Sequence, residues 1–156
     1  PVAMSAPDNE LIAQTLLFSE GFKCAKQLAG KITAIFLLCK QMLSLQIHYD
    51  WGLRALKTIL LASGNFISEE LQKNDTLTPV QEAEIMIKAL CVNTTSKLTF
   101  EDLVKFNSII VDVMPETQIV EFTNDRLSKA IEQTLLEMKL DSLPRQKMKV
   151  LQLYEA

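Results

Sequence analysis

Glycine and proline are scarce in this chain, with four and five copies among 156 residues, and aromatic residues make up only 6%. Leucine, isoleucine, lysine, glutamate, glutamine and alanine dominate instead, a composition that favours helix over sheet. Hydrophobic residues reach 48% and charged residues 22%, enough for a core in one domain, or one domain plus a piece of the next. The composition therefore predicts an all-α fold.

Residues that could build a metal or catalytic centre are also few. His48 is the single histidine, and Cys24, Cys39 and Cys91 form no C-x-x-C pair. A metal site needs converging ligands, and a Ser/His/Asp or Cys/His relay would have to use His48, with no Gly-x-Ser-x-Gly elbow in the chain. We interpret His48 as a hydrogen-bonding loop or core residue, and the cysteines as buried, reduced thiols of a cytosolic chain.

The phosphate-loop signature is absent as well. The triplet Gly30-Lys31-Ile32 lacks the final serine or threonine, and Ala25 occupies the position that requires an earlier glycine. The acid pairs at residues 69–70 and 101–102 would point in different directions on a helix, so we interpret them as solvated faces or helix-start charges. This segment is therefore not expected to be a self-sufficient enzyme.

Neither nucleic acid nor a membrane is an expected partner. The net charge is −3, and no stripe of Lys and Arg with interleaved aromatics is present. The longest apolar run, residues 32–39, is far shorter than the roughly 20 residues that a bilayer span needs, and no signal peptide precedes it. Because the chain begins abruptly at Pro1 and stops at Ala156 inside a helical pattern, we expect an excised fragment of a longer protein.

Helix start and stop signals divide the chain into a series of helices. A start at Pro7-Asp8 and a capping box at residues 78–81 are the clearest signals. The helices are expected at residues 8–21, 22–46, 52–62, 78–91, 99–114 and 123–138, with another that opens at 142–144. Residues 63–65 are expected to end the third helix, with a short turn at 66–71. Residues 1–4 and 118–122 are expected to be extended.

The second of these helices is apolar on all sides at residues 34–39, which predicts a position at the centre of a helical bundle.

The most distinctive stretch is residues 46–57, with the sequence QIHYDWGLRALK. Gly52 is expected to open a helix closely against a neighbour, and Arg54 to project from its first turn. Leu53 and Leu56 recur at helical spacing and are expected to be buried. A guanidinium beside the free N–H groups of a helix start favours anions, so this corner suits a phosphate group.

Several segments, in their order and spacing, resemble the motor region of dynein heavy chains. They are PVAM with Pro7-Asp8, LFSEGF at 17–22, HYDWGLRALK at 48–57 and SGN at 63–65. Trp51 and residues 58–60 and 96–100 look most like the cytoplasmic dynein-2 type, the motor for retrograde intraflagellar transport. Glu116 departs from the family pattern, which often has glycine there, and residues 72–76 are not distinctive.

The resemblance implies a division of the chain. Residues 1–4 would end a strand of a missing large AAA+ subdomain, and residues 5–114 would form the helical small (lid) subdomain of the first module. Residues 115–156 would be the linker and first helices of the following module. Arg54 matches the family's sensor-II arginine, supported by Gly52, Trp51 and Leu53, and for Trp51 and Leu53 we favour packing over contact with adenine.

The resemblance also implies the activity of the parent protein, an ATP-driven, minus-end-directed microtubule motor. ATP or ADP with Mg would bind the intact motor and not tightly this segment, which lacks the phosphate loop and the acidic Walker B strand. The implied partners are neighbouring AAA+ subdomains, microtubules and dynein accessory chains, in the cytoplasm, cytoskeleton and cilium or flagellum.

Two other interpretations remain open from the residues alone. One is a stand-alone helical module whose Leu, Ile and Met faces bind a partner helix, although methionines at helical spacing more often belong to a core. The other is the lid of a different AAA+ ring protein, which would have no need of the full block at residues 48–57.

Overall fold

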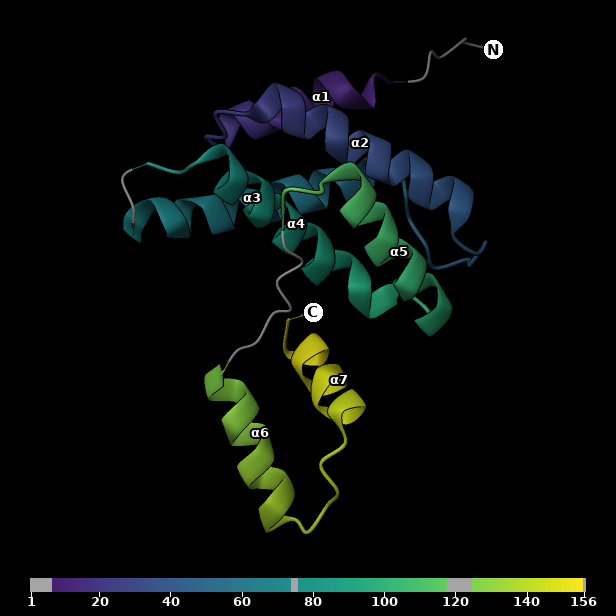
Figure 1. Ribbon diagram of the computed structural model, residues 1–156, viewed down its shortest axis with the longest axis vertical. Coiled ribbons are helices and arrows are strands. Elements are labelled where there is room, and N and C mark those ends of the chain that lie inside the picture. The colour runs from purple at the N-terminus through teal and green to yellow at the C-terminus, as the bar shows by residue number, and fades with distance from the viewer. Residues whose placement is uncertain (1–6, 74–75, 118–124, 156) are drawn as a thin grey trace.

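The computed structural model describes residues 7–73, 76–117 and 125–155 (Figure 1). Its elements are α1 (Asn9–Ser19), α2 (Ala25–Met42), α3 (Leu53–Lys73), α4 (Pro79–Thr94), the 3-10 turn η1 (Thr95–Lys97), α5 (Phe100–Val113), α6 (Asp125–Glu137) and α7 (Pro144–Glu155). No described residue is in a β-strand, so the all-α prediction is confirmed for this part of the chain. The extended segments predicted at residues 1–4 and 118–122 lie outside it.

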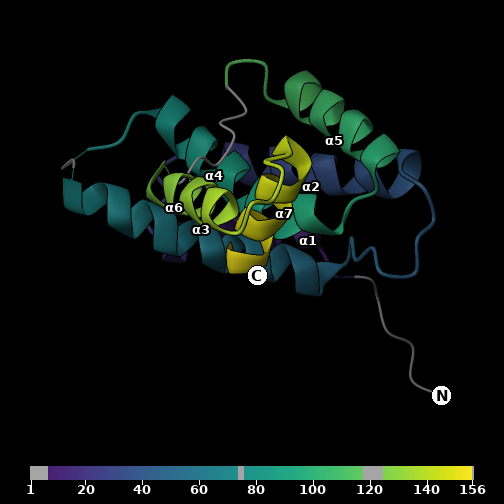
Figure 2. The same cartoon turned by 90° about the horizontal axis from the view of Figure 1, so that it is seen from below.

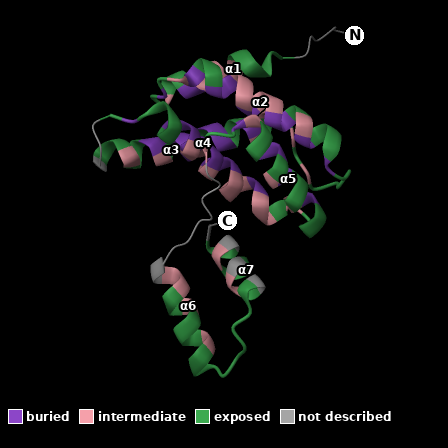
Figure 3. Cartoon of the chain, in the orientation of Figure 1, coloured by how far each residue is buried: buried purple, intermediate pink, exposed green. Residues whose placement is uncertain are grey.

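The first five helices form one bundle. Helix α1 packs on α2 and α3, α3 packs on α4, and α5 packs on α2. Figure 2 shows α3 and α5 on opposite sides of this bundle. Buried residues line the inward sides of α1 to α5 (Figure 3). The largest side chains in this core include Leu17, Ile32, Ile35, Leu56, Leu60, Ile67, Met86, Leu90, Phe106 and Ile110.

Helices α6 and α7 pack against each other, and those of their side chains that the structure describes are half-buried or exposed. None of the described helices has both the length and the apolarity needed to cross a bilayer.

The strongest local start signals are confirmed. The Asp8 carboxylate accepts hydrogen bonds from the backbone N–H groups of Glu10 and Leu11, both at 3.1 Å, and so caps α1. Thr78 and Gln81 form the predicted capping box at the start of α4. Helix α5 ends at Val113, before Pro115, as the restriction on a residue that precedes proline predicts.

The predicted end of the third helix at residues 63–65 is wrong, because α3 continues to Lys73 and includes the predicted turn at 66–71. Ser63 is buried, and its hydroxyl donates to the Leu60 carbonyl at 2.7 Å. Gly64 lies against the side chain of Glu20, at the end of α1. Ile67 is buried in the core, so packing of the following turn keeps these residues helical.

The prediction that the second helix is central and buried on all sides is also wrong. Helix α2 spans Ala25–Met42 only, and it buries one face with Ile32, Ile35 and Cys39. Leu37, on another face, is 57% exposed. The apolar run at residues 34–39 therefore includes a solvent-exposed side chain and does not lie wholly in the core.

The start of α2 is capped from a distant helix. Its first residues offer no side-chain cap, but the buried Glu82 carboxylate, in the first turn of α4, accepts from the N–H groups of Lys23 at 3.1 Å and Cys24 at 2.9 Å. A carboxylate beside free helical N–H groups is favourable in charge as well as in hydrogen bonding. This contact joins α4 to α2.

We expect the two helical glycines to respond differently to alanine. Gly30→Ala should raise the free energy of unfolding by about 0.5–1 kcal/mol, because alanine is the better helix former and its methyl group would make ordinary contacts with the Glu10 carboxyl group, 3.5 Å from Oε1 and 3.9 Å from Cδ. Gly64→Ala should bring no such gain, because its methyl group would overlap the Glu20 carboxylate and lie 2.9 Å from Glu20 Cγ. Urea unfolding of the 156-residue chain and both variants measures the difference, and equal gains would contradict the close approach at Gly64.

Candidate functional site

Arg54 lies in the first turn of α3, where the sequence places it, and its side chain is exposed. The guanidinium makes no hydrogen bond or ion pair with any residue that the structure describes. The first N–H groups of a helix have no partner within that helix. Arg54 thus presents an exposed cation at the N-terminal end of α3.

Gly52 precedes this turn, and its carbonyl accepts the first helical hydrogen bond from Leu56 N at 3.1 Å. The expected close approach of Gly52 to a neighbouring element is wrong, because the residue is exposed. Its near neighbour is the Asp50 carboxylate, which accepts from Gly52 N at 2.9 Å and would lie 3.0 Å from a Cβ atom at this position. Asp50 thus shapes the turn that leads into α3.

Trp51 and Leu53, on either side of this glycine, pack against the core. The Trp51 ring contacts Phe36 edge to face at a centroid distance of 5.6 Å, and it lies 6.3 Å from Phe106. The packing role that we favoured for both residues agrees with these contacts.

A hollow of about 210 Å³ lies beside Arg54. Its walls come from residues 48–51, from the first two turns of α3, and from Asn93 and Lys97 at the end of α4 and in η1, with Phe36 of α2 completing it. The hollow therefore brings the 48–51 stretch and Arg54 together with a segment that lies about forty residues later in the chain.

His48 is a hydrogen-bonding loop residue, as predicted. Its Nε2 lies 2.9 Å from the Lys97 carbonyl oxygen, and its ring contacts Tyr49 edge to face at 4.8 Å. The hydrogen bond to the Lys97 carbonyl connects the loop to η1.

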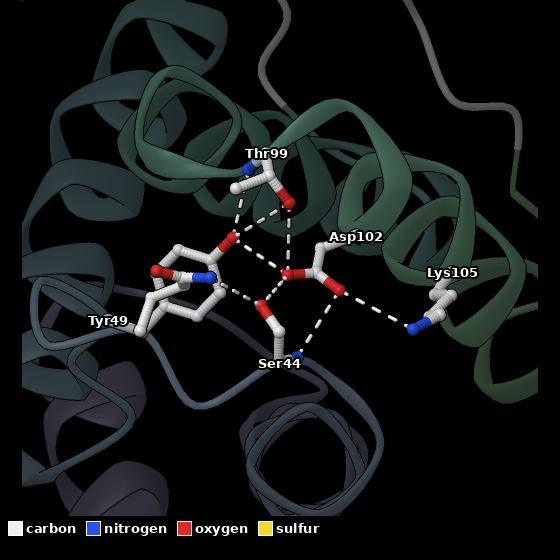
Figure 4. Close-up of polar contacts among 6 residues, drawn as sticks. Ser44, Tyr49, Thr99, Asp102 and Lys105 are labelled. Carbon is white, nitrogen blue, oxygen red and sulfur yellow. Dashed lines mark hydrogen bonds and ion pairs between the residues drawn. The ribbon is translucent and has the colours of Figure 1, made fainter.

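The site also contains a carboxylate whose burial the sequence pattern did not predict. Glu101 is exposed, as expected of a helix-start charge, but Asp102 is only 1% exposed. Figure 4 shows Ser44, Tyr49 and Thr99 converging on Asp102. A Thr-x-x-Asp spacing at a helix start was the available signal, since it resembles a capping box.

Asp102 accepts several hydrogen bonds. The donors are the Ser44 hydroxyl, the Ser44 N–H at 3.2 Å, the Tyr49 hydroxyl at 2.9 Å and the Thr99 hydroxyl at 3.1 Å. The half-exposed Lys105 ammonium lies 3.6 Å away. The Ser44 hydroxyl makes the largest contribution in lowering the pKa of Asp102 to about 2, with Tyr49, the Ser44 amide and Thr99 adding to it against the opposing effect of burial.

The three cysteines are free thiols. Cys39 is buried as predicted, whereas Cys24 and Cys91 are half-buried. Burial raises the pKa of Cys39 to about 12 and that of Cys91 to about 11, so both remain protonated at neutral pH. Among the described residues no three His, Cys, Asp or Glu side chains gather in a way that could hold a metal ion.

Comparisons with known proteins agree with the resemblance seen in the sequence. The family described as the hydrolytic ATP binding site of the dynein motor region matches residues 1–156. Cytoplasmic dynein 2 heavy chain 1 is 50% identical to this chain in Mus musculus, 49% in Homo sapiens and 47% in Tripneustes gratilla, over 99% of the chain.

The chain spans about 4% of the length of these relatives. The match along the whole chain selects the dynein interpretation over the two alternatives that the residues had left open. The chain therefore belongs to the dynein heavy chain family and is part of its motor region.

Proposed function

We propose that residues 5–114 form the lid of the first AAA+ module of a dynein heavy chain, and that Arg54 contacts the γ-phosphate of ATP bound by the preceding large subdomain. The observation that carries this proposal is the position of Arg54. Its guanidinium is exposed and unpaired among the described residues, at the start of α3 and beside a hollow. Gly52, Trp51 and Leu53 support it through the turn and the packing around it.

The chemistry suits a sensor. An arginine–phosphate contact is charge-assisted and can use two parallel hydrogen bonds. It exists fully only while the γ-phosphate is present, so hydrolysis and phosphate release remove it. The lid would then rotate as a rigid body relative to the large subdomain, because a close-packed bundle passes a rotation on with little deformation. To move the lid from a 1:99 to a 99:1 population of two orientations, the nucleotide would have to favour one orientation by about 5.5 kcal/mol of differential affinity.

Residues 115–156 would then be the linker and first helices of the second module. We further propose that the parent heavy chain is an ATP-driven, minus-end-directed microtubule motor of retrograde intraflagellar transport, working in the cytoplasm and cilium. Its support is the similarity of the whole chain to heavy chains named cytoplasmic dynein 2. Mg²⁺ bound with the nucleotide would neutralise charge at the phosphates. Of the described residues, Arg54 is the one that we expect to contact these phosphates.

The test is Arg54→Ala in the intact heavy chain. We expect ATP to bind about tenfold or more weaker while ADP binding changes little, because one charge-assisted hydrogen bond is worth about 1.5–3 kcal/mol, and we expect slower ATP turnover and microtubule gliding. Nucleotide titration and gliding assays measure these effects.

Lys57→Ala is the matched control, since Lys57 is an exposed cation one turn further along the same helix. An unchanged ratio of ATP to ADP affinity in Arg54→Ala, or an equal change in Lys57→Ala, would remove the sensor assignment.

A further inference from the structure

The α2–α3 loop, residues 43–52, is tied at two points to the first turn of α5. Near its start, the Ser44 N–H and hydroxyl donate to Asp102. Further along, the Tyr49 hydroxyl donates to the same carboxylate at 2.9 Å and accepts from Thr99 N at 2.9 Å. We call Ser44, Tyr49, Thr99 and Asp102 the loop anchor (Figure 4).

Between the loop anchor and Arg54, each successive part of the chain is held by a contact. Asp50 is tied to Gly52 N, and the Trp51 ring lies between Phe36 of α2 and Phe106 of α5. The helical hydrogen bonds of α3 begin at the Gly52 carbonyl. Little freedom therefore remains between Tyr49 and the first turn that carries Arg54.

The loop also connects α5 to the start of α3 through side-chain contacts. Helix α5 packs extensively on α2, and it lies on the other side of the bundle from α3 (Figure 2). Tyr49 and Trp51, which lie in the half of the loop next to Arg54, contact Asp102 and Phe106 of α5. A shift of α5 would consequently reach Arg54 through this loop.

The anchor suits a positioning role because the carboxylate at its centre, Asp102, is buried and charged. An ionised carboxylate with only 1% of its surface exposed needs its hydrogen-bond donors, so losing Tyr49 or Ser44 would leave it poorly compensated. The loop thus has one strongly preferred position. Tyr49 lines the same hollow as Arg54, so this position also sets one wall of the site.

We propose that Asp102 and Tyr49 are positioning residues, which hold the α2–α3 loop on α5 and thereby fix the direction in which Arg54 is presented. This inference rests on the proposed γ-phosphate contact of Arg54. It adds that the sensor is coupled to α5, so that displacement of α5 by a neighbouring part of the ring changes the nucleotide response.

The test uses Tyr49→Phe in the intact heavy chain, which removes one hydroxyl and keeps the ring that contacts His48 and Trp51. We expect the ratio of ATP to ADP affinity to fall by about three- to tenfold, the range that one hydrogen bond supports. Asp102→Asn should act in the same direction. In an Arg54→Ala background Tyr49→Phe should have no further effect, because the residue that it positions is gone.

Glu82→Gln is the matched control. Glu82 is an equally buried carboxylate that also accepts backbone N–H groups, but it caps α2, away from the loop. We expect this variant to melt at a lower temperature and to keep the ATP to ADP ratio. The rate of backbone amide hydrogen exchange should rise at residues 44–56 in Tyr49→Phe, and near residues 23–28 in Glu82→Gln.

The outcomes separate this inference from the proposed function. The positioning role is refuted, while the Arg54 contact stands, if the losses in the ATP to ADP affinity ratio from Tyr49→Phe and Arg54→Ala are additive in the double variant. It is also refuted if Glu82→Gln lowers this ratio as much as Tyr49→Phe does. The positioning role is refuted in the same way if Tyr49→Phe and Asp102→Asn both leave the ratio unchanged. If Arg54→Ala itself has no effect, the proposed function fails and the positioning role falls with it.

Discussion

Replacing Phe106 by alanine is expected to lower the free energy of unfolding of the 156-residue chain by about 3–5 kcal/mol, because it removes a large ring from a close-packed core. Phe106 is completely buried on α5, and its ring lies 6.3 Å from that of Trp51. The loss therefore combines the transfer of apolar surface with a cavity between α5 and the α2–α3 loop. Urea unfolding followed by far-UV circular dichroism measures the change.

Leu37→Ala is the control for this prediction. Leu37 is 57% exposed on α2, so the same kind of truncation should change stability by no more than about 0.5 kcal/mol. Similar losses in the two variants would show that Phe106 is not in a core that the folded chain depends on.

The second large effect is expected at Asp102, as a change in the response to acid. The pKa of Asp102 is lowered in the folded chain from 3.8 to about 2, chiefly by the Ser44 hydroxyl. Folding therefore favours the ionised form, and this stabilisation is complete above about pH 5 and is lost as the pH falls through 4 toward 2. Asp102→Asn should lower the free energy of unfolding by about 1.5–3 kcal/mol at neutral pH, the range for hydrogen bonds to a charged group.

The difference between the parent chain and Asp102→Asn should accordingly shrink between pH 5 and pH 2. Glu101→Gln provides the control, because Glu101 is the adjacent acid on the same helix turn and is exposed. Unfolding curves at a series of pH values measure both variants. A difference that stays constant down to pH 2 would contradict the lowered pKa of Asp102.

The sequence by itself determined the fold class, most helix starts and the family. The signals at Asp8 and Thr78 act within a few residues, since each side chain caps N–H groups two or three positions away. Pro115 likewise restricts its immediate predecessor. The block around Arg54 was distinctive in its order of residues, so the resemblance to dynein heavy chains needed no knowledge of packing.

Only the tertiary structure decided the outcome where the local sequence pattern was ambiguous. Ser63, Gly64 and Asn65 have the composition of a helix end, yet α3 continues because Ile67 is buried and Gly64 meets Glu20 of another helix. Glu101 and Asp102 are equivalent as a local pair, yet one is solvated and the other holds Ser44, 58 residues earlier in the chain. Glu82 likewise caps residues 58 and 59 positions away. The energy of a buried carboxylate depends on the donors that surround it, and these donors are brought together only when the helices pack.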